Sequence, residues 1–407
     1  MNASQAPQRT IPFSPPDITE EEISEVAEAL RSGWITTGPR TKELERQLKD
    51  FTSAAGFACF SSATSALECA LRVLGIGPGD EVISCAYTYT ASASPVVHVG
   101  ATLVLCDVAP GSFLIDLEDV ARHITPRTKA IIPVDLGGCM VDYDALFSLV
   151  ESRACEFEAS NDIQAALGRI AIVADGAHAL GSCYKGRPAG SVADFTSFSF
   201  HAVKNFTTAE GGGLAWRDFG YSSQDIYHQL MLLSLHGQSK DALAKTKVGA
   251  WEYDVIFPGY KCNMTDIQAA LGLVQLRRYP DMLARRRAMI ARYEKALAEA
   301  PVKLISHHTD SYTSSGHLML VRIDGADCQQ RNCVIERMGE AGIACNVHYK
   351  PLPLLSAYKN LGFKMSDFPY SYAQFENEIS LPLHTKLTDE DIDYICENLI
   401  RILKEIR

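Results

Sequence analysis

Short apolar runs alternate with helical patterns up to about residue 216, and this alternation constrains the fold more than any other feature. Several of these runs are apolar on both faces, as strands covered by helices on each side must be. The candidate strands are 57–60, 81–84, 102–107, 130–134, 170–175, 195–200 and 213–216. Such an alternation predicts an α/β fold with a mostly parallel sheet.

Helical signals bracket this region. Thr19, with Glu22 three residues later, forms a capping box that predicts a helix over residues 19–31. A second helix is expected from Thr265 to about residue 275, and an arginine-rich helix over 281–299. Beyond it, residues 317–323 are a candidate strand, and a C-terminal helix starts at Thr388 with its apolar residues on one face. We therefore expect a large domain over 1–275, including the N-terminal segment, and a small C-terminal α+β domain over 276–407.

The arginines of the 276–300 region allow two interpretations. They could form a phosphate-binding patch or the solvated face of a helix, and the second is favoured. The set is Arg277, Arg278, Arg285, Arg286, Arg287 and Arg292.

Composition excludes several classes of protein. The chain has 407 residues with 38 Lys+Arg against 49 Asp+Glu, a formal charge of −11, so it lacks the basic footprint of a nucleic-acid-binding protein. No run approaches the ~20 apolar residues that span a bilayer, and the first ten residues are polar, so neither a membrane partner nor a secretory signal is expected. The 12 cysteines occur singly without a CxxC pair, which favours a reducing, cytoplasmic location and no metal site.

Three segments carry candidate chemistry, and the first is FACFSSATSAL at 57–67. A strand ends there in small and hydroxylated residues that open a helix. The free N–H groups of a helix N-terminus, with the hydroxyls of Ser62 and Thr64, suit a phosphate group. Serine and threonine are also ordinary helix N-caps, so the segment alone allows both interpretations.

The second segment is IAIVADGAHALGS at 170–182. An apolar strand places Asp175 at its C-terminal end, where open α/β sheets bind ligands. A carboxylate there can hold a protonated ring nitrogen, and His178 could reach a neighbouring polar atom of the same ligand. A strand-end aspartate that caps the next turn is the structural alternative.

The third segment, FTSFSFHAVKNFTTAEGGGLAW at 195–216, is the most informative. Lys204 lies near a strand end among apolar residues, where partial desolvation lowers a lysine pKa and favours a Schiff-base nucleophile. Ser199, five residues earlier, could bind phosphate. Together the three strand ends match a phosphate, a pyridine nitrogen and an aldehyde, which are the groups of pyridoxal phosphate (PLP).

With these segments, the chain resembles the DegT/DnrJ/EryC1/StrS family of PLP-dependent sugar aminotransferases, in the fold-type I (aspartate aminotransferase) superfamily. The resemblance runs nearly end to end through SGWITTGP, SSATSALECAL, YTYTASASPV, ADGAHALGS, SFHAVKNFTTAEGG, GYKCNMTDIQAALGLVQL and HYKPLP. It implies the three-layer transferase fold of that superfamily, with a mostly parallel central sheet and a smaller C-terminal α+β domain.

The resemblance also implies roles for individual residues. Lys204 would bond covalently to the cofactor, Asp175 would pair with the pyridinium nitrogen, and His178 would contact the phenolic oxygen. The phosphate would be bound by Ala63, Thr64 and Ser199, and Tyr89 would stack on the ring.

One position implies a shared active site. Most members have Asn where this chain has Lys261, and that Asn reaches the phosphate of the neighbouring subunit. Lys261 resembles the variant of the 4-amino-4-deoxyarabinose branch, so a homodimer with shared sites is implied.

The chain departs from the family at three further positions and by one insertion. Ala63 stands where Gly is frequent, Ala86 where Pro is frequent, and Asp135 where His is common. Residues 155–167 add length, and we expect them to form a surface loop or extended helix.

The implied reaction moves an amino group from L-glutamate to a keto group of a nucleotide-linked sugar. Sugar contacts would come from Trp34 and Thr36 and from His348 and Tyr349. A UDP-linked 4-keto sugar is favoured because the GWITTGP and GYKCN segments are analogous to those of family members.

Other functions fit the same motifs. A dehydratase branch of the family has His in place of the lysine, so Lys204 argues against it. One alternative is an aminotransferase that acts on a cyclitol or a free keto sugar. Another is a PLP-binding regulatory or scaffolding protein without turnover, but the intact set of Lys204, Asp175 and His178 argues against this second alternative.

Overall fold

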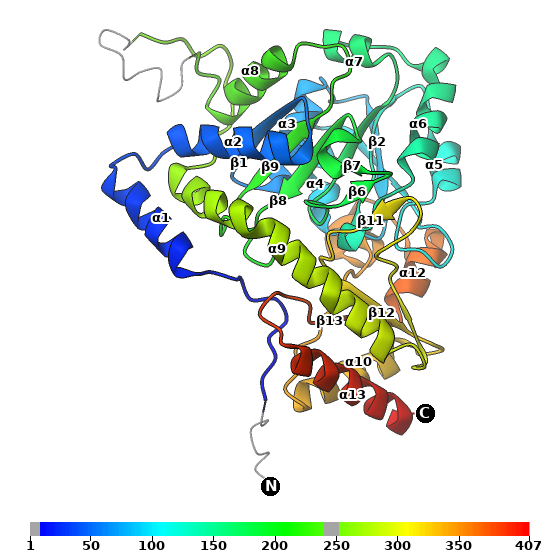
Figure 1. The fold of residues 1–407 in the computed structure, drawn as a ribbon. Coiled ribbons are helices and arrows are strands. Elements are labelled where there is room, and N and C mark those ends of the chain that lie inside the picture. The colour runs from blue at the N-terminus through cyan, green and yellow to red at the C-terminus, as the bar shows by residue number, and fades with distance from the viewer. Residues whose placement is uncertain (1–8, 240–251, 407) are drawn as a thin grey trace.

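A seven-stranded sheet forms the centre of the computed structural model, which describes residues 9–239 and 252–406 (Figure 1). Its strands, in spatial order, are β1 (Gly56–Phe60), β9 (Gly212–Trp216), β8 (Phe195–Ser199), β5 (Ala171–Asp175), β4 (Thr128–Ile132), β2 (Glu81–Cys85) and β3 (Thr102–Cys106). Strand β9 is antiparallel to both neighbours, and the other adjacent strands are parallel. The predicted mostly parallel α/β sheet is confirmed, and each predicted strand lies within two residues of an observed one.

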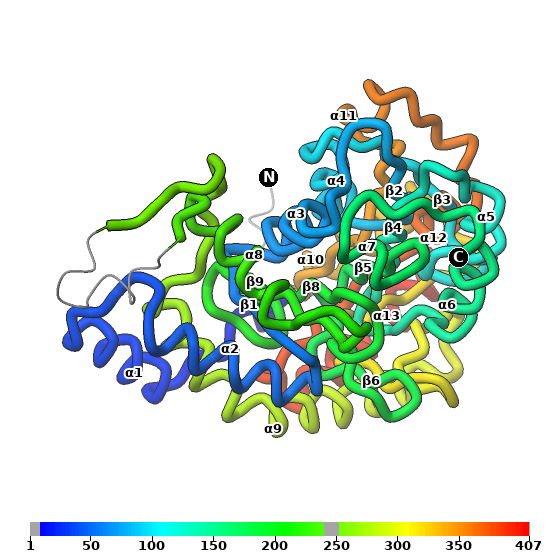
Figure 2. The backbone as a smooth tube through the Cα atoms, turned by 90° about the horizontal axis from the view of Figure 1, so that it is seen from above, coloured from blue at the N-terminus to red at the C-terminus, as the bar shows by residue number. Residues whose placement is uncertain are grey.

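Helices cover both faces of this sheet. The helices that precede β9 in the sequence are α1 (Glu20–Arg31), α2 (Pro39–Thr52), α3 (Ala63–Val73), α4 (Ser94–His98), α5 (Leu117–His123), α6 (Tyr143–Ser152) and α7 (Asp162–Leu167). Those that follow are α8 (Ser223–Ser234), α9 (Asp266–Ala296), α10 (Cys328–Glu340), α11 (Ser356–Asn360), α12 (Pro369–Phe375) and α13 (Asp389–Ile406). Seen from above, the strands lie between α3 and α8 on one side and α2 and α9 on the other (Figure 2). Among the described residues, no helix combines the length and apolarity needed to cross a bilayer.

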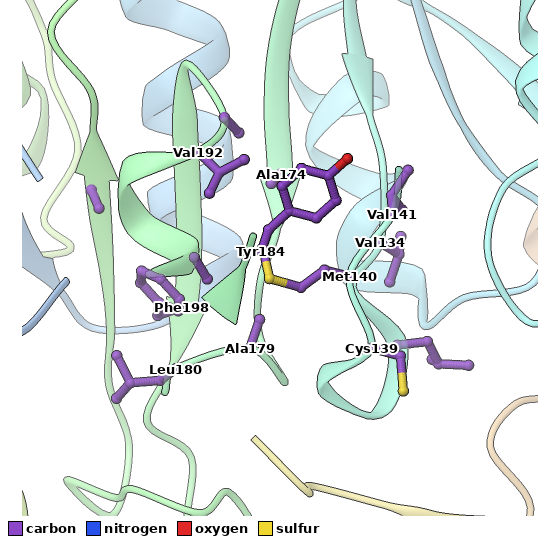
Figure 3. Close-up of a cluster of buried hydrophobic side chains, with 14 of the residues drawn as sticks. Val134, Cys139, Met140, Val141, Ala174, Ala179, Leu180, Tyr184, Val192 and Phe198 are labelled. Atoms are coloured by element: carbon purple, nitrogen blue, oxygen red, sulfur yellow. The ribbon is translucent and has the colours of Figure 1, made fainter. Parts of the chain in front are cut away.

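Adjacent residues of each central strand point into two different cores, which explains why the strands are apolar throughout. Ile131 and Ile172 belong to the core beneath α2, α6 and α9, whereas Ile132 and Val173 belong to the core beneath α3 and α8. Figure 3 shows part of the first core, where Tyr184 packs among apolar side chains near Ala174. Strand alternation therefore buries both faces, giving the three layers that the resemblance implied.

A smaller antiparallel sheet lies in the C-terminal part. It is formed by β10 (Val302–Leu304), β12 (Met319–Ile323) and β13 (Glu378–Leu381), and α10 and α13 pack with it in a third core. A third sheet consists of β6 (Cys183–Tyr184), β7 (Arg187–Pro188) and β11 (Tyr312–Thr313). Only β12 and α13 of this region were predicted.

Helix α9 differs from the prediction of two helices, because it runs unbroken through Pro280. A proline inside a helix costs about 3 kcal/mol through a lost hydrogen bond and a steric clash. Burial on both sides of the proline compensates: Tyr279 is buried and its hydroxyl donates to the Leu180 carbonyl, and Leu283 lies in the first core. The expected domain boundary at 275/276 falls inside this helix and remains a proposal. Of the N-terminal segment assigned to the large domain, Ile11 packs in the third core.

The arginines of α9 mostly tie elements together. Arg278 pairs with Asp17 and Glu22, and Arg292 pairs with Asp393. Arg286 is buried and donates to the carbonyls of Gly316 and Leu383. The favoured interpretation of a solvated face is therefore wrong for Arg286, which fixes a buried junction.

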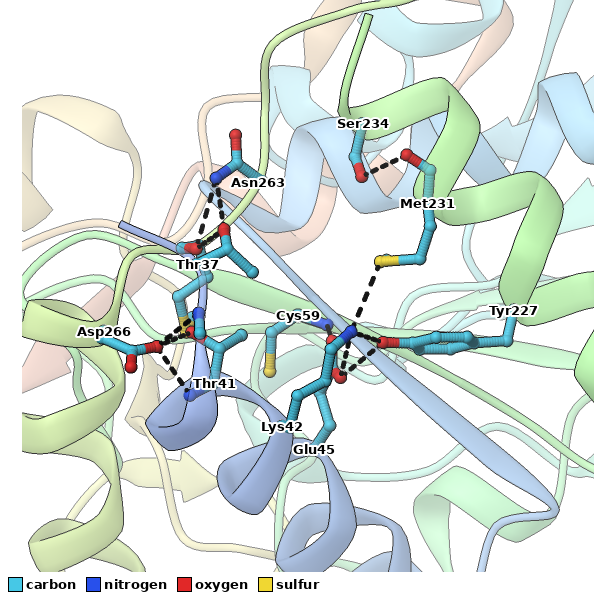
Figure 4. A network of polar contacts seen from close by, with 12 residues as sticks. Thr37, Thr41, Lys42, Glu45, Cys59, Tyr227, Met231, Ser234, Asn263 and Asp266 are labelled. Atoms are coloured by element: carbon cyan, nitrogen blue, oxygen red, sulfur yellow. Dashed lines mark hydrogen bonds and ion pairs between the residues drawn. The ribbon is translucent and has the colours of Figure 1, made fainter. Parts of the chain in front are cut away.

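The start of α9 also caps the start of α2. The buried Asp266 carboxylate accepts the backbone N–H groups of Gly38, Arg40 and Thr41 at 2.8–3.0 Å and the Thr41 hydroxyl at 2.7 Å (Figure 4). These N–H groups are unpaired donors of a helix N-terminus, and a carboxylate there also interacts favourably with the helix dipole.

Replacement of this carboxylate should destabilise the fold. Asp266→Ala leaves several buried donors without an acceptor, so we expect a loss of about 3 kcal/mol in the free energy of unfolding, measured by urea denaturation. Glu43→Gln, on the exposed face of α2, is the control and should change it by less than about 0.5 kcal/mol. Equal stability of the two variants would contradict this role of Asp266.

Candidate active site

A cavity of about 330 Å³ lies at the C-terminal ends of β5 and β8 and the N-terminus of α3. Eight of the predicted site residues line it: Ala63, Thr64, Tyr89, Asp175, His178, Ser199, Lys204 and Tyr349. The structure thus brings together side chains from three segments that lie far apart in the sequence.

One end of the cavity is the N-terminus of α3. Ser62 is its N-cap, and the Ser62 side chain accepts the Ser65 N–H at 3.1 Å, so the hydroxyl serves the helix. The N–H groups of Ala63 and Thr64 belong to the first turn, which has no intrahelical acceptors for them. Strand β9 passes close behind: a Cβ on Gly212 would lie 2.3 Å from the Ala63 nitrogen. This end therefore suits an anion.

Asp175 lies at the last position of β5 and is buried. Its Oδ2 accepts the Ser92 hydroxyl at 2.6 Å, and its Oδ1 accepts the Ala177 N–H at 3.1 Å. Burial raises the pKa of this carboxyl, while the two hydrogen bonds and the nearby Lys204 oppose that rise. Such a group is suited to hold a cation that enters the cavity.

His178 presents a defined nitrogen to the cavity. Its Nδ1 accepts the Gly137 N–H at 3.1 Å, so the proton of the neutral ring lies on Nε2, which is 3.2 Å from the Tyr349 hydroxyl. Burial and the positive charge of Lys204 lower the pKa of His178 well below its usual range. His178 is therefore a neutral donor at this wall.

Lys204 follows β8 and contributes to the opposite wall. Burial lowers the pKa of its ammonium to about 8, with Asp175 acting in the opposite direction. A lysine with this pKa has a substantial fraction of free amine near neutral pH, which is the nucleophilic form.

Tyr89 and Tyr349 lie at the rim. Tyr89 is 60% exposed, and its ring centroid lies 5.9 Å from that of Tyr349. His348 faces a separate cavity of about 60 Å³ on the other side of Lys204.

Three predicted residues lie outside the cavity of their own chain. Trp34 donates from Nε1 to the Thr37 carbonyl at 3.2 Å, the Thr36 carbonyl accepts the Asp266 N–H, and Lys261 donates to Asn263. These three residues share one surface, because Asn263 also contacts Thr37 (Figure 4).

Two polar residues at this site, Asn205 and His317, were not predicted from the sequence. The His317 ring lies 4.3 Å from that of His178, and its Nδ1 donates to Asn205 Oδ1 at 2.9 Å. Asn205 directly follows Lys204, and His317 is the first residue of the predicted strand 317–323. Their contact could not be predicted because 112 positions separate them in the sequence. Burial lowers the pKa of His317 well below its usual range.

One group of possible metal ligands lies elsewhere in the described part of the chain. It comprises Cys106, Asp119 and His123, whose ligand atoms lie within 4.8 Å of one another. His123 Nδ1 already bonds to the Asp119 carbonyl at 2.9 Å, and the Asp119 carboxylate accepts from Arg122 and the Asp107 N–H. We therefore assign no metal, and its absence stays a prediction.

Comparison with known proteins identifies the class. Spr1654 from Streptococcus pneumoniae, described as a sugar aminotransferase and solved in a PMP form, matches with a TM-score of 0.96 at 56% identity, over 98% of this chain and 100% of that one. Its PLP form matches with a TM-score of 0.95. Helicobacter pylori PseC, an aminotransferase involved in the biosynthesis of pseudoaminic acid, matches with a TM-score of 0.85 at 26% identity, covering 98% of this chain and all of PseC.

The model of the DegT/DnrJ/EryC1/StrS aminotransferase family matches residues 16–400, and the chain belongs to this family. The spore coat polysaccharide biosynthesis protein SpsC of Bacillus subtilis is 36% identical over 398 residues, 97% of each chain. The predicted fold, the resemblance and the cofactor PLP are confirmed, and the protein is a sugar aminotransferase.

The cavity fits that cofactor. Its anion-binding end, buried carboxylate and low-pKa lysine match the phosphate, ring nitrogen and aldehyde of PLP, and they line one space.

Asp135, a departure from the family, is a buried structural acid beside this site. Its carboxylate accepts the Val141 N–H at 3.0 Å and the Tyr143 hydroxyl at 2.9 Å. Burial and the charge of Asp175 raise the pKa of Asp135 to about 7, although its two hydrogen bonds oppose the rise.

This raised pKa predicts a pH-dependent stability. The folded state holds the Asp135 proton more tightly than the unfolded state, so stability is lost as pH rises from about 4 through 7. Relative to Asp135→Asn, the wild type should lose about 2 kcal/mol of unfolding free energy between pH 5 and pH 7, measured by urea denaturation. A constant difference between the two proteins over this range would contradict the burial of a titrating carboxyl.

Proposed function

We propose that this enzyme transfers the amino group of L-glutamate to a keto group of a nucleotide-linked sugar, by analogy a UDP-linked 4-keto sugar as in the 4-amino-4-deoxyarabinose branch. The observation that carries the proposal is the meeting of Lys204, Asp175 and His178 around one cavity. The link of SpsC to spore coat polysaccharide biosynthesis supports a sugar as the acceptor.

The bound cofactor supplies an electron sink for the carbanion at the amino-acid α-carbon. Asp175 keeps a proton on the ring nitrogen, because a buried carboxylate is stabilised by a positive partner. His178 donates from Nε2 to the phenolic oxygen. Ser92 holds Asp175 in place through the 2.6 Å hydrogen bond to Oδ2.

Lys204 has two roles. It would hold the cofactor covalently, and its amine would take the proton from the substrate α-carbon as a general base and return it as a general acid. Its lowered pKa favours the free amine that covalent attachment and the general-base role require.

Anion binding and stacking complete the cofactor site. The N–H groups of Ala63 and Thr64 and the hydroxyl of Ser199 bind the phosphate at the start of α3. An alanine at position 63 is compatible with this role because only its backbone N–H is used. Tyr89 stacks on the ring from the rim, and Tyr349 borders the substrate.

We also propose that the active site is shared in a homodimer. Trp34, Thr36 and Lys261 lie together outside their own cavity, so their roles in sugar and phosphate binding require the cavity of a second subunit. Two apolar side chains near these residues are exposed. Ile35, which lies between Trp34 and Thr36, is 49% exposed, and Ile256, five residues before Lys261, is 57% exposed. A partner would cover them.

The lowered pKa of Lys204 predicts how the apoprotein takes up its cofactor. The rate of covalent attachment of PLP, followed by absorbance, should rise with pH with a midpoint near pH 8, whereas an ordinary lysine would have a midpoint near pH 10.4. Lys204→Ala should show no covalent attachment. In Asp175→Asn the midpoint should move to lower pH, because the carboxylate raises the pKa of Lys204; an unchanged midpoint would contradict their electrostatic contact.

The shared site predicts complementation between two inactive variants. In a re-equilibrated mixture of Lys204→Ala and Lys261→Ala subunits, half of the dimers are mixed and each holds one intact site, so about a quarter of wild-type activity should return. Each variant alone, refolded in the same way, is the control. Failure of the mixture to exceed the sum of the two variants would contradict a shared site.

The amino transfer is tested by product formation. The purified enzyme should release 2-oxoglutarate from L-glutamate in a single turnover and continue only when a keto sugar is added. A panel of UDP-linked and dTDP-linked keto sugars, free keto sugars and keto-cyclitols then identifies the acceptor. Turnover with a cyclitol or free sugar alone would overturn the nucleotide sugar, and no release of 2-oxoglutarate would favour a regulatory or scaffolding role.

A further inference from the structure

Behind Lys204, His348 is held by a chain of buried polar groups that the mechanism above does not use. His348 Nδ1 lies 2.8 Å from the Ser380 hydroxyl, and that hydroxyl donates to Glu378 Oε1 at 2.6 Å. The backbone N–H of His348 donates to Glu378 Oε2 at 2.9 Å. Glu378 and Ser380 are fully buried on β13, two residues apart, so their side chains share one face of the strand.

The other nitrogen of His348 faces the ligand side. His348 lines the cavity of about 60 Å³ together with Lys204 and Tyr349. Because Ser380 engages Nδ1, Nε2 is the nitrogen left for this cavity. The Phe13 ring stacks on the imidazole at 5.5 Å, and the Tyr87 hydroxyl donates to the His348 carbonyl at 2.9 Å, so the ring is held in place.

The direction of the hydrogen bonds along this chain depends on one proton. When Glu378 is ionised, Ser380 donates to it and accepts from His348 Nδ1–H, which leaves Nε2 as an acceptor. When Glu378 is protonated, the proton lies on Oε1, because Oε2 accepts the backbone N–H. Ser380 then accepts from Glu378 and donates to Nδ1, which places the imidazole proton on Nε2.

We propose that Glu378 is a positioning residue whose proton is relayed through Ser380 to His348, so that His348 Nε2 changes between hydrogen-bond donor and acceptor beside Lys204. As a donor, Nε2 suits a carboxylate or keto oxygen of the ligand; as an acceptor, it does not. The contact of His348 with a substrate rests on the proposed function, whereas the coupling of Glu378 to His348 does not.

Glu378 is expected to change its protonation state near pH 8. Burial raises the pKa of Glu378 to about 8, while the hydrogen bonds from Ser380 and His348 and the charge of Arg331 oppose the rise. The titratable groups that face Glu378 are Arg331 from α10, Tyr87 after β2, and Cys345 and Tyr349 from the segment before β13.

His348 itself stays neutral in this range. Burial, with the positive charge of Lys204, lowers the pKa of His348 to about 4. Only its tautomer therefore responds as Glu378 titrates: Nε2 carries the proton below about pH 8 and loses it above.

Two substitutions separate the relay from mere packing. In Glu378→Gln the amide oxygen accepts the backbone N–H and the NH₂ group donates to Ser380, which reproduces the protonated state at every pH. Ser380→Ala breaks the chain between Glu378 and His348. Glu45→Gln is the matched control, because Glu45 is also a buried glutamate with a raised pKa but lies on α2 and accepts from Cys59 and Tyr227.

The direct measurement is the histidine ¹⁵N chemical shifts of the cofactor-loaded enzyme between pH 6 and pH 9, with the His348 signals assigned by their loss in His348→Gln. In wild type and Glu45→Gln the proton should move from Nε2 to Nδ1 with a midpoint near pH 8. It should stay on Nε2 throughout in Glu378→Gln, and the midpoint should vanish in Ser380→Ala. A single tautomer over the whole range in wild type, or a wild-type midpoint in Glu378→Gln or Ser380→Ala, would overturn the relay.

Kinetics test the consequence for the ligand separately. The KM for L-glutamate or for the keto acceptor should rise roughly tenfold from pH 7 to pH 9 in wild type, the effect of one lost hydrogen bond to a charged or polar group, and stay constant in Glu378→Gln. A tautomer change without this KM change would confirm the relay and remove His348 from the substrate site. An enzyme without any transamination would refute the proposed function while leaving the shift data interpretable.

Discussion

The burial of two opposite charges in one cavity is the constraint on which the rest of this site depends. Asp175 ends β5, and Lys204 lies in the segment that follows the neighbouring parallel strand β8; each is desolvated, and each partly compensates the other. Desolvation gives the lysine its free amine, and the lysine limits the cost of the buried carboxylate. A cofactor with a positive ring nitrogen and an aldehyde can then satisfy both groups in the same position.

The scaffold holds these strand ends through further buried polar contacts. Asp266 joins the starts of α2 and α9 and fixes the loop that carries Trp34 and Thr36. Arg286 joins α9 to the carbonyls of Gly316 and Leu383, close to the strands of the smaller sheet. Because α9 runs through Pro280 without a break, one helix connects the loop of Trp34 and Thr36 to the C-terminal part.

The central sheet and the main side chains of the cavity could be predicted from the sequence because their signals are local. The strands are apolar on both faces, and Asp175, Ser199 and Lys204 each lie at or near a predicted strand end. The continuity of α9 was missed because Pro280 is a local helix breaker that only tertiary packing tolerates. Strand β13 was missed because Glu378 and Ser380 interrupt an apolar pattern, although both are buried in the fold.

Contacts between distant segments could not be predicted from a single sequence. Asn205 and His317 meet across 112 positions, and Glu378 reaches His348 across 30 positions that include α11 and α12. The predicted roles of Trp34, Thr36 and Lys261 in a shared site likewise depend on a second subunit and remain a proposal.

The role of Lys204 is tested most directly by reducing the PLP-loaded enzyme with borohydride and mapping the modified peptide by mass spectrometry, with and without prior incubation with L-glutamate. The cofactor should be trapped on Lys204, and glutamate in excess should remove this modification by converting the cofactor to its amine form. Trapping on another lysine, or a Lys204 modification that glutamate leaves unchanged, would contradict this role.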